Sequence, residues 1–288
     1  GLQFSELYFD YNGLPELALY TARDGATLAY RYYPAQEADH VLVLLHGSGW
    51  HSRYFLPLAQ YLSENDLANV YTPDLRGHGT NPERRGDIDY ISQFEDDIAD
   101  LVDFIREKHP NAALIMGGHS SGGGLAIRYG GSKYGEQIDA YLAMAPFLKY
   151  NAPTARPDSG GWAKVHNGRM MGLTMFNNVG IHWFDSLKVI EFEMPEEARD
   201  GTETLAYTFR LNTGFAPRNY KKDLGAITQP FLLVVGAEDE AFYADQYAPI
   251  IATYNGGQVE VLPGLSHNGV VVDESAHVVI AEWLKSLE

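Results

Sequence analysis

Apolar residues recur along the chain in two alternating patterns. Short and almost wholly apolar runs, such as residues 40–45 (HVLVLL) and 231–235 (FLLVV), are typical of strands that are buried on both faces. Longer stretches repeat apolar residues at helical spacing, as residues 88–108 do, with one apolar stripe opposite an acidic face. Alternation of the two patterns predicts the α/β fold class, with a mostly parallel sheet covered by helices on both faces.

The chain predicts a regular series of elements. We expect strands at residues 17–22, 27–33, 40–45, 69–73, 113–116, 138–145, 231–235 and 258–262, and helices at 54–63, 88–108 and 274–287. The first two strands flank Arg23-Asp24-Gly25-Ala26, and an Asp-Gly pair is a strong hairpin signal. The sheet is therefore expected to begin with antiparallel strands and to continue with parallel ones.

The alternation breaks between Pro146 and Pro230, where no buried-strand run occurs. This stretch is rich in Gly, Asn, Met and aromatic residues, among them Trp162, Met170, Met171, Met175, Phe176, Trp183, Phe184, Phe192 and Met194. We interpret it as a lid inserted into the sheet domain, with residues 1–146 and 226–288 forming the core and 147–225 the lid. Most of these side chains are expected to pack the lid onto the core, and the rest to line an apolar pocket.

One segment carries the strongest chemical signal. Residues 113–128 read ALIMGGHSSGGGLAIR, an apolar run followed by a Gly-x-Ser-x-Gly turn and an amphipathic stretch. Flanking glycines allow a strained serine to sit where a strand turns sharply into a helix, with its Oγ clear of both. Ser120 is the predicted nucleophile. Ser121 is the alternative, but that frame would place the bulky His119 where the turn needs a small residue.

A serine hydroxyl needs a base and a group that orients the base. Asp239 follows the apolar run 231–235, at the end of a strand where catalytic groups collect in open α/β sheets, and is the predicted acid. Its neighbours Glu238 and Glu240 are alternatives, interpreted as solvated loop acids. His267 lies in a Gly-rich loop after the last strand and is the predicted base, whereas His277, inside the final helix, is expected to pack.

The same reasoning predicts two backbone donors for the oxyanion that forms when the serine attacks a carbonyl. The amide of Ser121 opens the helix after the turn, where it has no helical partner. The second donor is expected from the loop His46-Gly47-Ser48-Gly49, which follows the first buried strand. We assign it to the amide of Ser48.

Composition limits the partners. A formal charge of -17 disfavours nucleic acid and anionic bilayers, which would repel the chain, so neither nucleic acid nor strong membrane association is expected. No run is apolar and long enough for a membrane span and no leader pattern is present, so the chain reads as soluble, although it starts at Gly1 and an upstream signal or anchor is compatible with it. The absence of cysteine excludes disulfides and thiol chemistry.

No cofactor or metal is expected. The histidines lack the spacing of a zinc site such as HExxH, and the spacing of Gly122-Gly123-Gly124 does not fit a dinucleotide fingerprint. The residues His46, Asp74, Arg76 and His78 are interpreted as braces of the loops around the site, because buried paired groups are more often structural than chemical.

These motifs together resemble the α/β-hydrolase superfamily. They are HGSGWHS at 46–52, PDLRGHG at 73–79, GHSSGG at 118–123, GAED at 236–239 and the loop that holds His267. Within it the chain most resembles the lysophospholipase and monoacylglycerol-lipase group. It differs from that group at Arg53-Tyr54-Phe55 and at Thr80-Asn81-Pro82, and no counterpart of the lid was identified.

The order Ser120, Asp239, His267 and the resemblance predict a cofactor-independent serine esterase acting through an acyl-enzyme. A carboxylesterase for small-molecule esters of short to medium chain length is expected first. A monoacylglycerol lipase or lysophospholipase is the alternative, followed by an amide, thioester or carbon–carbon bond hydrolase. A non-catalytic ligand receptor is the alternative from another class, because fold does not fix function.

Overall fold

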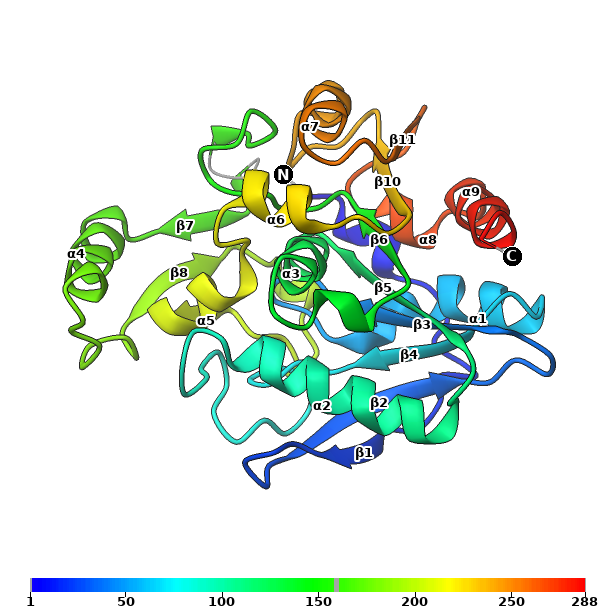
Figure 1. Ribbon diagram of the computed structural model, residues 1–288. Coiled ribbons are helices and arrows are strands. Elements are labelled where there is room, and N and C mark those ends of the chain that lie inside the picture. Colours follow the sequence, from blue (N-terminus) through cyan, green and yellow to red (C-terminus); the bar gives the residue numbers. More distant parts are fainter. Residues whose placement is uncertain (1, 158–160, 288) are drawn as a thin grey trace.

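An eight-stranded sheet forms the centre of the protein (Figure 1), as seen in a computed structural model that describes residues 2–157 and 161–287. Its strand order is β1-β2-β4-β3-β5-β6-β10-β11. The strands are β1 (Ala18–Thr21), β2 (Thr27–Tyr33), β3 (His40–Leu45), β4 (Asn69–Pro73), β5 (Ala113–His119), β6 (Ala140–Met144), β10 (Phe231–Gly236) and β11 (Gln258–Leu262). The predicted strands therefore all occur in this sheet, with small differences at their ends.

The sheet changes direction where the sequence predicts it. β1 and β2 form an antiparallel hairpin in which Ala18 pairs with Tyr30, and β2 runs antiparallel to β4. The Asp24 carboxylate accepts a hydrogen bond from the Ala26 amide at 3.0 Å and thereby closes the hairpin turn. All later pairings, from β3–β4 to β10–β11, are parallel. The predicted α/β class with a mostly parallel sheet is confirmed.

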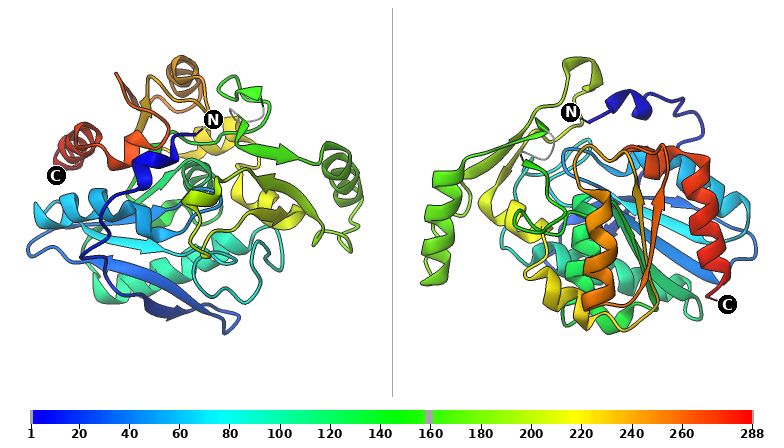
Figure 2. Two further views of the ribbon diagram at one scale, coloured as in Figure 1. Left: turned by 180° about the vertical axis from the view of Figure 1, so that it is seen from behind. Right: turned by 90° about the horizontal axis from the view of Figure 1, so that it is seen from above.

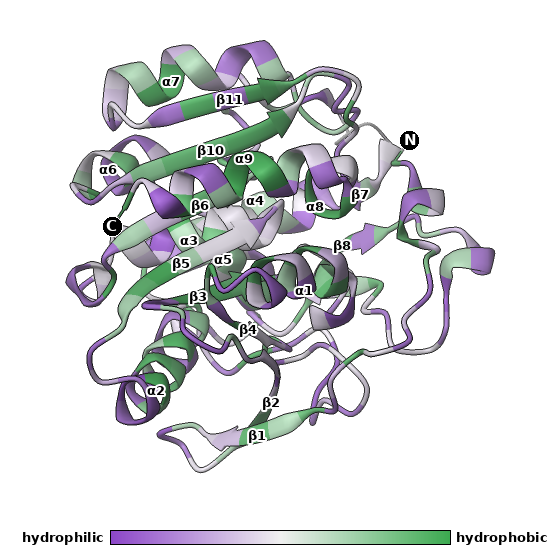
Figure 3. Ribbon diagram, turned by 90° about the vertical axis from the view of Figure 1, so that its right-hand side faces the viewer, coloured by the Kyte–Doolittle hydropathy of each residue, from purple (hydrophilic) through white to green (hydrophobic). Residues whose placement is uncertain are grey.

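Helices cover both faces of this sheet (Figure 2). Their bounds are α1 (Leu56–Glu64), α2 (Gln93–Lys108), α3 (Ser121–Gly130), α7 (Tyr247–Tyr254), α8 (Gly269–Val272) and α9 (Glu274–Lys285). Contacts group α1 with α8 and α9, whereas α3 packs on α6 (Tyr220–Ala226), which in turn packs on α7. Every residue of β3, β4, β6 and β10 is buried, and the apolar strand β10 is green in Figure 3.

The segment between β6 and β10 leaves the main sheet and forms a structure of its own. It contains a three-stranded antiparallel sheet of β7 (Ala163–Val165), β8 (Lys188–Phe192) and β9 (Ala206–Thr208), together with α4 (Asn167–Asn178) and α5 (Phe209–Phe215). The strands were missed in the sequence because β8 is only half-buried, so it carries no continuous apolar run. We call residues 145–230 the inserted segment; α4 lies at its outer end, away from the main sheet (Figures 1 and 2).

The helix predicted at 88–108 begins five residues later, at Gln93. The residues before it form a loop in which the Gln93 side chain accepts a hydrogen bond from the Asp89 amide at 2.6 Å. The loop is held by the inserted segment, since the Thr208 amide donates to the carbonyl oxygen of Gly86 at 3.0 Å. Ile88 is fully buried in this loop, so its apolar character reflects packing and not helix.

Within residues 2–157 and 161–287, no helix combines the length and apolar character needed to cross a membrane.

Candidate active site

Ser120 lies at a sharp turn between β5 and α3. Its φ is 55° and its ψ is -121°, a backbone conformation that residues with a side chain rarely adopt. Such strain persists where the surrounding structure enforces it, and it is common at catalytic positions. The Ser120 side chain is half-buried, so the hydroxyl at this predicted nucleophile is reachable from solvent.

The glycines around Ser120 are required by the closeness of the backbones. A Cβ on Gly118 would lie 2.2 Å from the carbonyl oxygen of Gly122, and one on Gly122 would lie 2.0 Å from that of Leu45. Both distances are far below van der Waals contact. The sequence prediction of a strand, a tight turn and a helix therefore agrees with the observed turn in each part.

Asp239 and His267 form a buried pair. Their elements are neighbours, because β10 ends just before Asp239 and its partner β11 ends just before the His267 loop. His267 Nδ1 lies 2.8 Å from Asp239 Oδ2, and the other carboxylate oxygen accepts from the amides of Ala241 and Phe242, each at 2.8 Å. Both oxygens of the Asp239 carboxylate are thus held by hydrogen bonds. Because Nδ1 of His267 faces Asp239, the other ring nitrogen, Nε2, points away from that carboxylate.

The electrostatics of the pair favour a proton on the imidazole. Burial lowers the pKa of His267, but the charge and hydrogen bond of Asp239 outweigh burial and raise that pKa above its ordinary value. Among the described residues, the Ser120 hydroxyl makes no hydrogen bond to His267. Catalytic hydrogen bonds are often loose without substrate, and the loop that carries His267 contacts His119, the residue before Ser120.

His119, the residue before Ser120, joins three parts of the site. Its Nε2 lies 2.9 Å from the carbonyl oxygen of His267, so Nε2 carries the proton and donates. Its Nδ1 then accepts from the hydroxyl of Tyr54 at 3.0 Å, and that hydroxyl accepts from the Gly47 amide at 2.9 Å. Burial holds the pKa of His119 well below its usual value, so the ring is neutral. The sequence analysis assigned no role to His119 or Tyr54.

The two predicted oxyanion donors are brought together. Ser48 lies in the loop after β3 and Ser121 is the first residue of α3, and their side-chain oxygens are 2.7 Å apart. Within the described residues neither backbone amide has a hydrogen-bond partner, so both remain free to donate. A Cβ on Gly47 would lie 3.2 Å from the Cβ of Ser120, which shows how closely this loop approaches the predicted nucleophile.

The inserted segment holds the same loop from the other side. The Tyr207 hydroxyl, from β9, accepts from the Gly49 amide at 2.7 Å and lies 2.7 Å from His78 Nε2. Burial lowers the pKa of His78, so its unprotonated Nε2 accepts the Tyr207 proton while Nδ1 donates to the carbonyl oxygen of Arg76 at 3.0 Å. The role of Tyr207 was not predicted, because this residue lies outside every motif that the sequence shows.

The residues interpreted as braces occupy that role. His46 spans two loops, since Nδ1 donates to the Gly47 carbonyl oxygen at 2.9 Å and Nε2 accepts from the Leu75 amide at 3.1 Å. Burial lowers its pKa to about 4, so it is neutral. Asp74 accepts from the Ser52 amide at 2.8 Å, and Arg76 forms a two-pronged contact with Asp97 at 2.7 and 2.8 Å.

The alternatives to the predicted acid and base fall into two groups. Glu238 is exposed, and His277 is buried in α9 with Nε2 2.7 Å from the carbonyl oxygen of Val271, as expected for a solvated acid and a packed histidine. Glu240 differs from the expectation. It is half-buried, and its carboxylate accepts hydrogen bonds from the backbone amides of Gln3 and His267, so the interpretation of Glu240 as a solvated loop acid is wrong.

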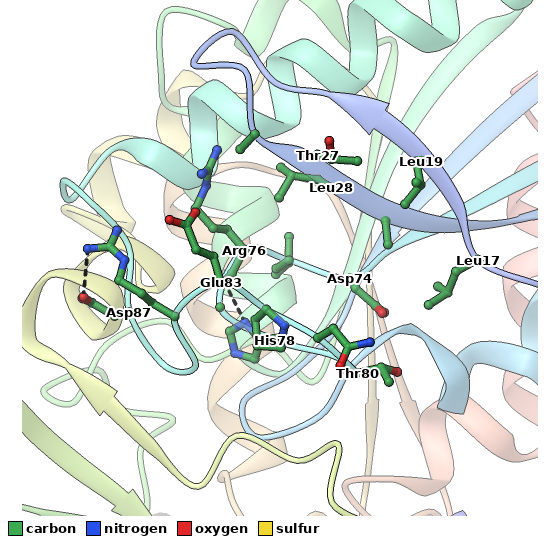
Figure 4. Close-up of a pocket in the computed structure, with 17 residues that line it drawn as sticks. Leu17, Leu19, Thr27, Leu28, Asp74, Arg76, His78, Thr80, Glu83 and Asp87 are labelled. Carbon is green, nitrogen blue, oxygen red and sulfur yellow. Dashed lines mark hydrogen bonds and ion pairs between the residues drawn. The ribbon is translucent and has the colours of Figure 1, made fainter.

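A separate hollow of about 450 Å³ lies beside the turn that follows β4 (Figure 4). Its wall includes Asp74, Arg76 and His78 but none of the predicted catalytic residues. Arg76 is neutralised by Asp97 and Asp24, so this hollow offers no unpaired charge there to select a ligand. Among residues 2–157 and 161–287 there is also no group of three or more His, Asp or Glu side chains placed to hold a metal ion.

Comparison with known proteins places this geometry in a family. The model of the family described as serine aminopeptidase, S33, matches residues 36–271, and the chain belongs to this family of α/β-hydrolases. The monoglyceride lipase of Homo sapiens is 27% identical over 236 residues, which cover 80% of this chain and 74% of that protein. The monoacylglycerol lipase of Mycolicibacterium smegmatis is 34% identical over 123 residues, 42% of this chain and 43% of that protein.

A solved structure shares the fold. It is a soluble variant of the monoglyceride lipase of Saccharomyces cerevisiae with a substrate analogue, with a TM-score of 0.72 at 18% identity, and the match covers 97% of this chain and 98% of that one. The predicted resemblance to the monoacylglycerol-lipase group is confirmed by these relatives. The chain is a serine ester hydrolase with an α/β-hydrolase fold.

Proposed function

We propose that the protein hydrolyses monoacylglycerols, with Ser120 as nucleophile, His267 as base, Asp239 as the acid that orients it, and the amides of Ser48 and Ser121 as the oxyanion hole. The human, yeast and mycobacterial relatives carry the names of monoglyceride or monoacylglycerol lipases, which supports this substrate class over a general carboxylesterase.

In the first half-reaction, His267 Nε2 takes the proton of Ser120 as its Oγ attacks the ester carbonyl carbon. We expect the backbone amides of Ser48 and Ser121 to hold the resulting oxyanion, a contribution of about 3–4 kcal/mol per donor in comparable sites. His267 then gives the proton to the glycerol oxygen, which leaves. Asp239 stabilises the imidazolium throughout, since its carboxylate lies 2.8 Å from Nδ1.

In the second half-reaction, water gives a proton to His267 and attacks the acyl carbon. The bond between that carbon and Ser120 Oγ breaks, the proton returns to Ser120, and the fatty acid leaves. No cofactor is needed, because proton transfer and charge stabilisation carry both steps.

The observation that carries the lipid substrate is an apolar exposed surface on the inserted segment. It is formed by α4 and the loop after it, with Met171, Met175, Phe176, Val179, Trp183, Phe184 and Leu187 all exposed. Trp183 is 85% exposed, and an exposed apolar patch of this kind marks an interaction site. We call these seven residues the α4 apolar surface. It suits an enzyme that takes its substrate from lipid aggregates.

A labelling experiment tests the nucleophile. A fluorophosphonate probe should label the wild type and the Ser121→Ala variant but not Ser120→Ala, because only Ser120 has the hydroxyl at the strained turn. Labelling of Ser120→Ala, read by gel fluorescence and by mass spectrometry of the modified peptide, would contradict the assignment.

A substrate series tests the lipid preference. We expect kcat/KM to rise from C4 to C16 monoacylglycerols, and Trp183→Gln to lower activity on aggregated long-chain substrate about tenfold while turnover of a soluble aryl acetate stays within twofold. A maximum at C4, with Trp183→Gln neutral on every substrate, would favour the short-chain carboxylesterase predicted first.

A further inference from the structure

The N-terminal residues Gln3–Leu7, which we call the arm, lie against the loop that carries His267. The arm includes the short helix η1 (Phe4–Leu7), which contacts α8 just after that loop (Figure 2). Phe4 and Leu7 are buried, at 7% and 2% exposure, so the arm is anchored by packing and not loosely laid on the surface. No motif of the sequence indicated this contact.

Three successive residues of the base loop are each tied to the arm. Asn268 donates from its side chain to the carbonyl oxygen of Gln3 at 3.2 Å. Ser266 donates its hydroxyl to the carboxylate of Glu6, and the same hydroxyl oxygen accepts from the Gly269 amide at 2.9 Å. His267 lies between these two residues, and the arm contacts it indirectly, through a third side chain.

Glu240 is that side chain, and it bridges the arm and His267. One of its carboxylate oxygens accepts from the Gln3 amide at 2.7 Å, and the other accepts from the His267 amide at 2.9 Å. Glu240 immediately follows Asp239, so the acid that orients the His267 ring and the acid that holds the His267 backbone are neighbours in one turn. The ring and the backbone of His267 are therefore both held by the turn that contains Asp239 and Glu240.

The opposite side of the arm contacts the two other parts of the site. The ring of Phe4 lies 6.3 Å from that of Trp50, beside the oxyanion loop, and 5.1 Å from that of Trp162 in the inserted segment. Farther along, Tyr11 lies under the guanidinium of Arg53, which pairs with Asp200 of the inserted segment. Packing of Phe4 thus connects the arm with Trp50 and with the inserted segment, and the chain just after the arm contacts the charged pair of Arg53 and Asp200.

From these contacts we infer that the arm and Glu240 form one positioning unit for the catalytic base, in which Glu240 transmits the placement of the arm to the backbone of His267. Glu240 touches neither substrate nor reacting atoms, so it is a positioning residue. The inference rests on the triad of the proposed function, and it does not depend on which ester is the substrate.

The charges around His267 give the unit a second, measurable effect. The groups that face the imidazole are Asp239, Glu240, Glu6 and the neutral ring of His119, whose centroid is 4.7 Å away. Burial lowers the pKa of His267, and the three carboxylates raise it. Removing the charge of Glu240 should therefore shift the acidic limb of the pH–rate profile to lower pH.

Glu240→Gln tests the bridge, because a glutamine side chain has one acceptor oxygen and loses one of the two amide contacts. We expect kcat on 4-nitrophenyl acetate to fall about tenfold with KM within twofold, since a small misplacement of the base lowers the rate of proton transfer. The acidic limb of kcat/KM should move to lower pH. Glu238→Gln is the matched control, because it removes the same charge from an exposed neighbour and should leave both quantities unchanged.

Gln3→Pro tests the arm, because proline lacks the amide proton that Glu240 accepts and the φ of Gln3, -87°, is close to that of proline. Its kcat should fall in the same direction, and the double variant with Glu240→Gln should be no slower than the worse single variant. Thermal unfolding of each variant identifies any that fail to fold.

The outcomes separate this inference from the proposed function. If the fluorophosphonate probe does not label the wild type at all, the assignment of Ser120 as nucleophile is refuted, and this inference is refuted with it. A labelled wild type with unchanged kcat and pH profile in Glu240→Gln and Gln3→Pro refutes the inference alone. Strictly additive losses in the double variant would show that the arm and Glu240 act separately, which also overturns the single unit.

Discussion

Single side chains in this site fix proton positions that a sequence does not display. His119 donates from Nε2 to a carbonyl, so its Nδ1 must accept, and this makes the Tyr54 hydroxyl a donor to His119 and an acceptor for Gly47. One hydroxyl thereby links the loop after β3 with His119, the residue before the proposed nucleophile. The direction of each of these hydrogen bonds follows from the carbonyl oxygen of His267, which can only accept.

Removal of that hydroxyl should be costly. Tyr54→Phe leaves the Gly47 amide and His119 Nδ1 buried without a partner, and we expect a loss of about 2–4 kcal/mol in the free energy of unfolding, together with a lower kcat. Urea denaturation at neutral pH measures the first quantity. Tyr8→Phe, at a side chain that is 52% exposed, is the control and should stay within about 0.5 kcal/mol of the wild type.

At the scale of elements, the site depends on how closely one strand end approaches another. The turn after β5 is pressed against the end of β3, and the closest point is Gly122, whose missing Cβ would meet the Leu45 carbonyl oxygen. Gly122 lies in α3 with ordinary helical backbone, so its conformation does not require glycine. Glycine is required here because there is no room for a side chain. Ser120, the proposed nucleophile, has the positive φ.

A pair of glycine substitutions distinguishes close packing from helix propensity. Gly122→Ala should unfold the turn or leave the protein insoluble, because the new Cβ would lie 2.0 Å from a backbone oxygen. Gly172→Ala, in the middle of α4 with open space around the position, should stabilise the protein by up to about 1 kcal/mol. Soluble yield and thermal unfolding of the two variants give the comparison. A well-folded Gly122→Ala protein would contradict the observed approach of the strands.

The sequence predicted short strands well where turn residues flank them on both sides. β3 and β11 have the predicted bounds because each is a short run between clear turn signals. The start of α2 was predicted wrongly, since Ile88 is buried by a loop bound to the inserted segment, and only tertiary structure shows that. The triad candidates came from strand ends, but Tyr207, Glu240 and the arm act through contacts between segments far apart in the chain, which no local pattern encodes.

At the scale of the whole molecule, buried histidines whose pKa is lowered by burial, among them His46, His78 and His119, make stability depend on pH. Burial lowers the pKa of His46 to about 4 and those of His78 and His119 well below their usual value, whereas in the unfolded chain each titrates near 6.5. The unfolded state therefore binds more protons than the folded state as the pH falls below about 6.5. Stability is present above that pH and is lost as the pH falls toward 4.

Each such histidine lowers the free energy of unfolding by up to about 1.4 kcal/mol per pH unit in this range. Urea denaturation at pH 7.5, 6 and 5 should show a steep loss between the last two values. His46→Asn should flatten the slope, and His182→Gln, at an exposed imidazole, should leave it as in the wild type. An equal slope in all three proteins would contradict the buried-histidine origin.

The bond between Tyr207 and Gly49 limits how freely parts of this enzyme can be exchanged. A designer who replaces residues 145–230 with the corresponding piece of a relative, to alter substrate choice, also removes the hydroxyl that holds the catalytic loop of the core. The transplanted piece would have to supply a hydroxyl at the same point. A chimera without this hydroxyl would lose one of the hydrogen bonds that hold the loop after β3, so turnover has to be measured in every chimera as well as substrate binding.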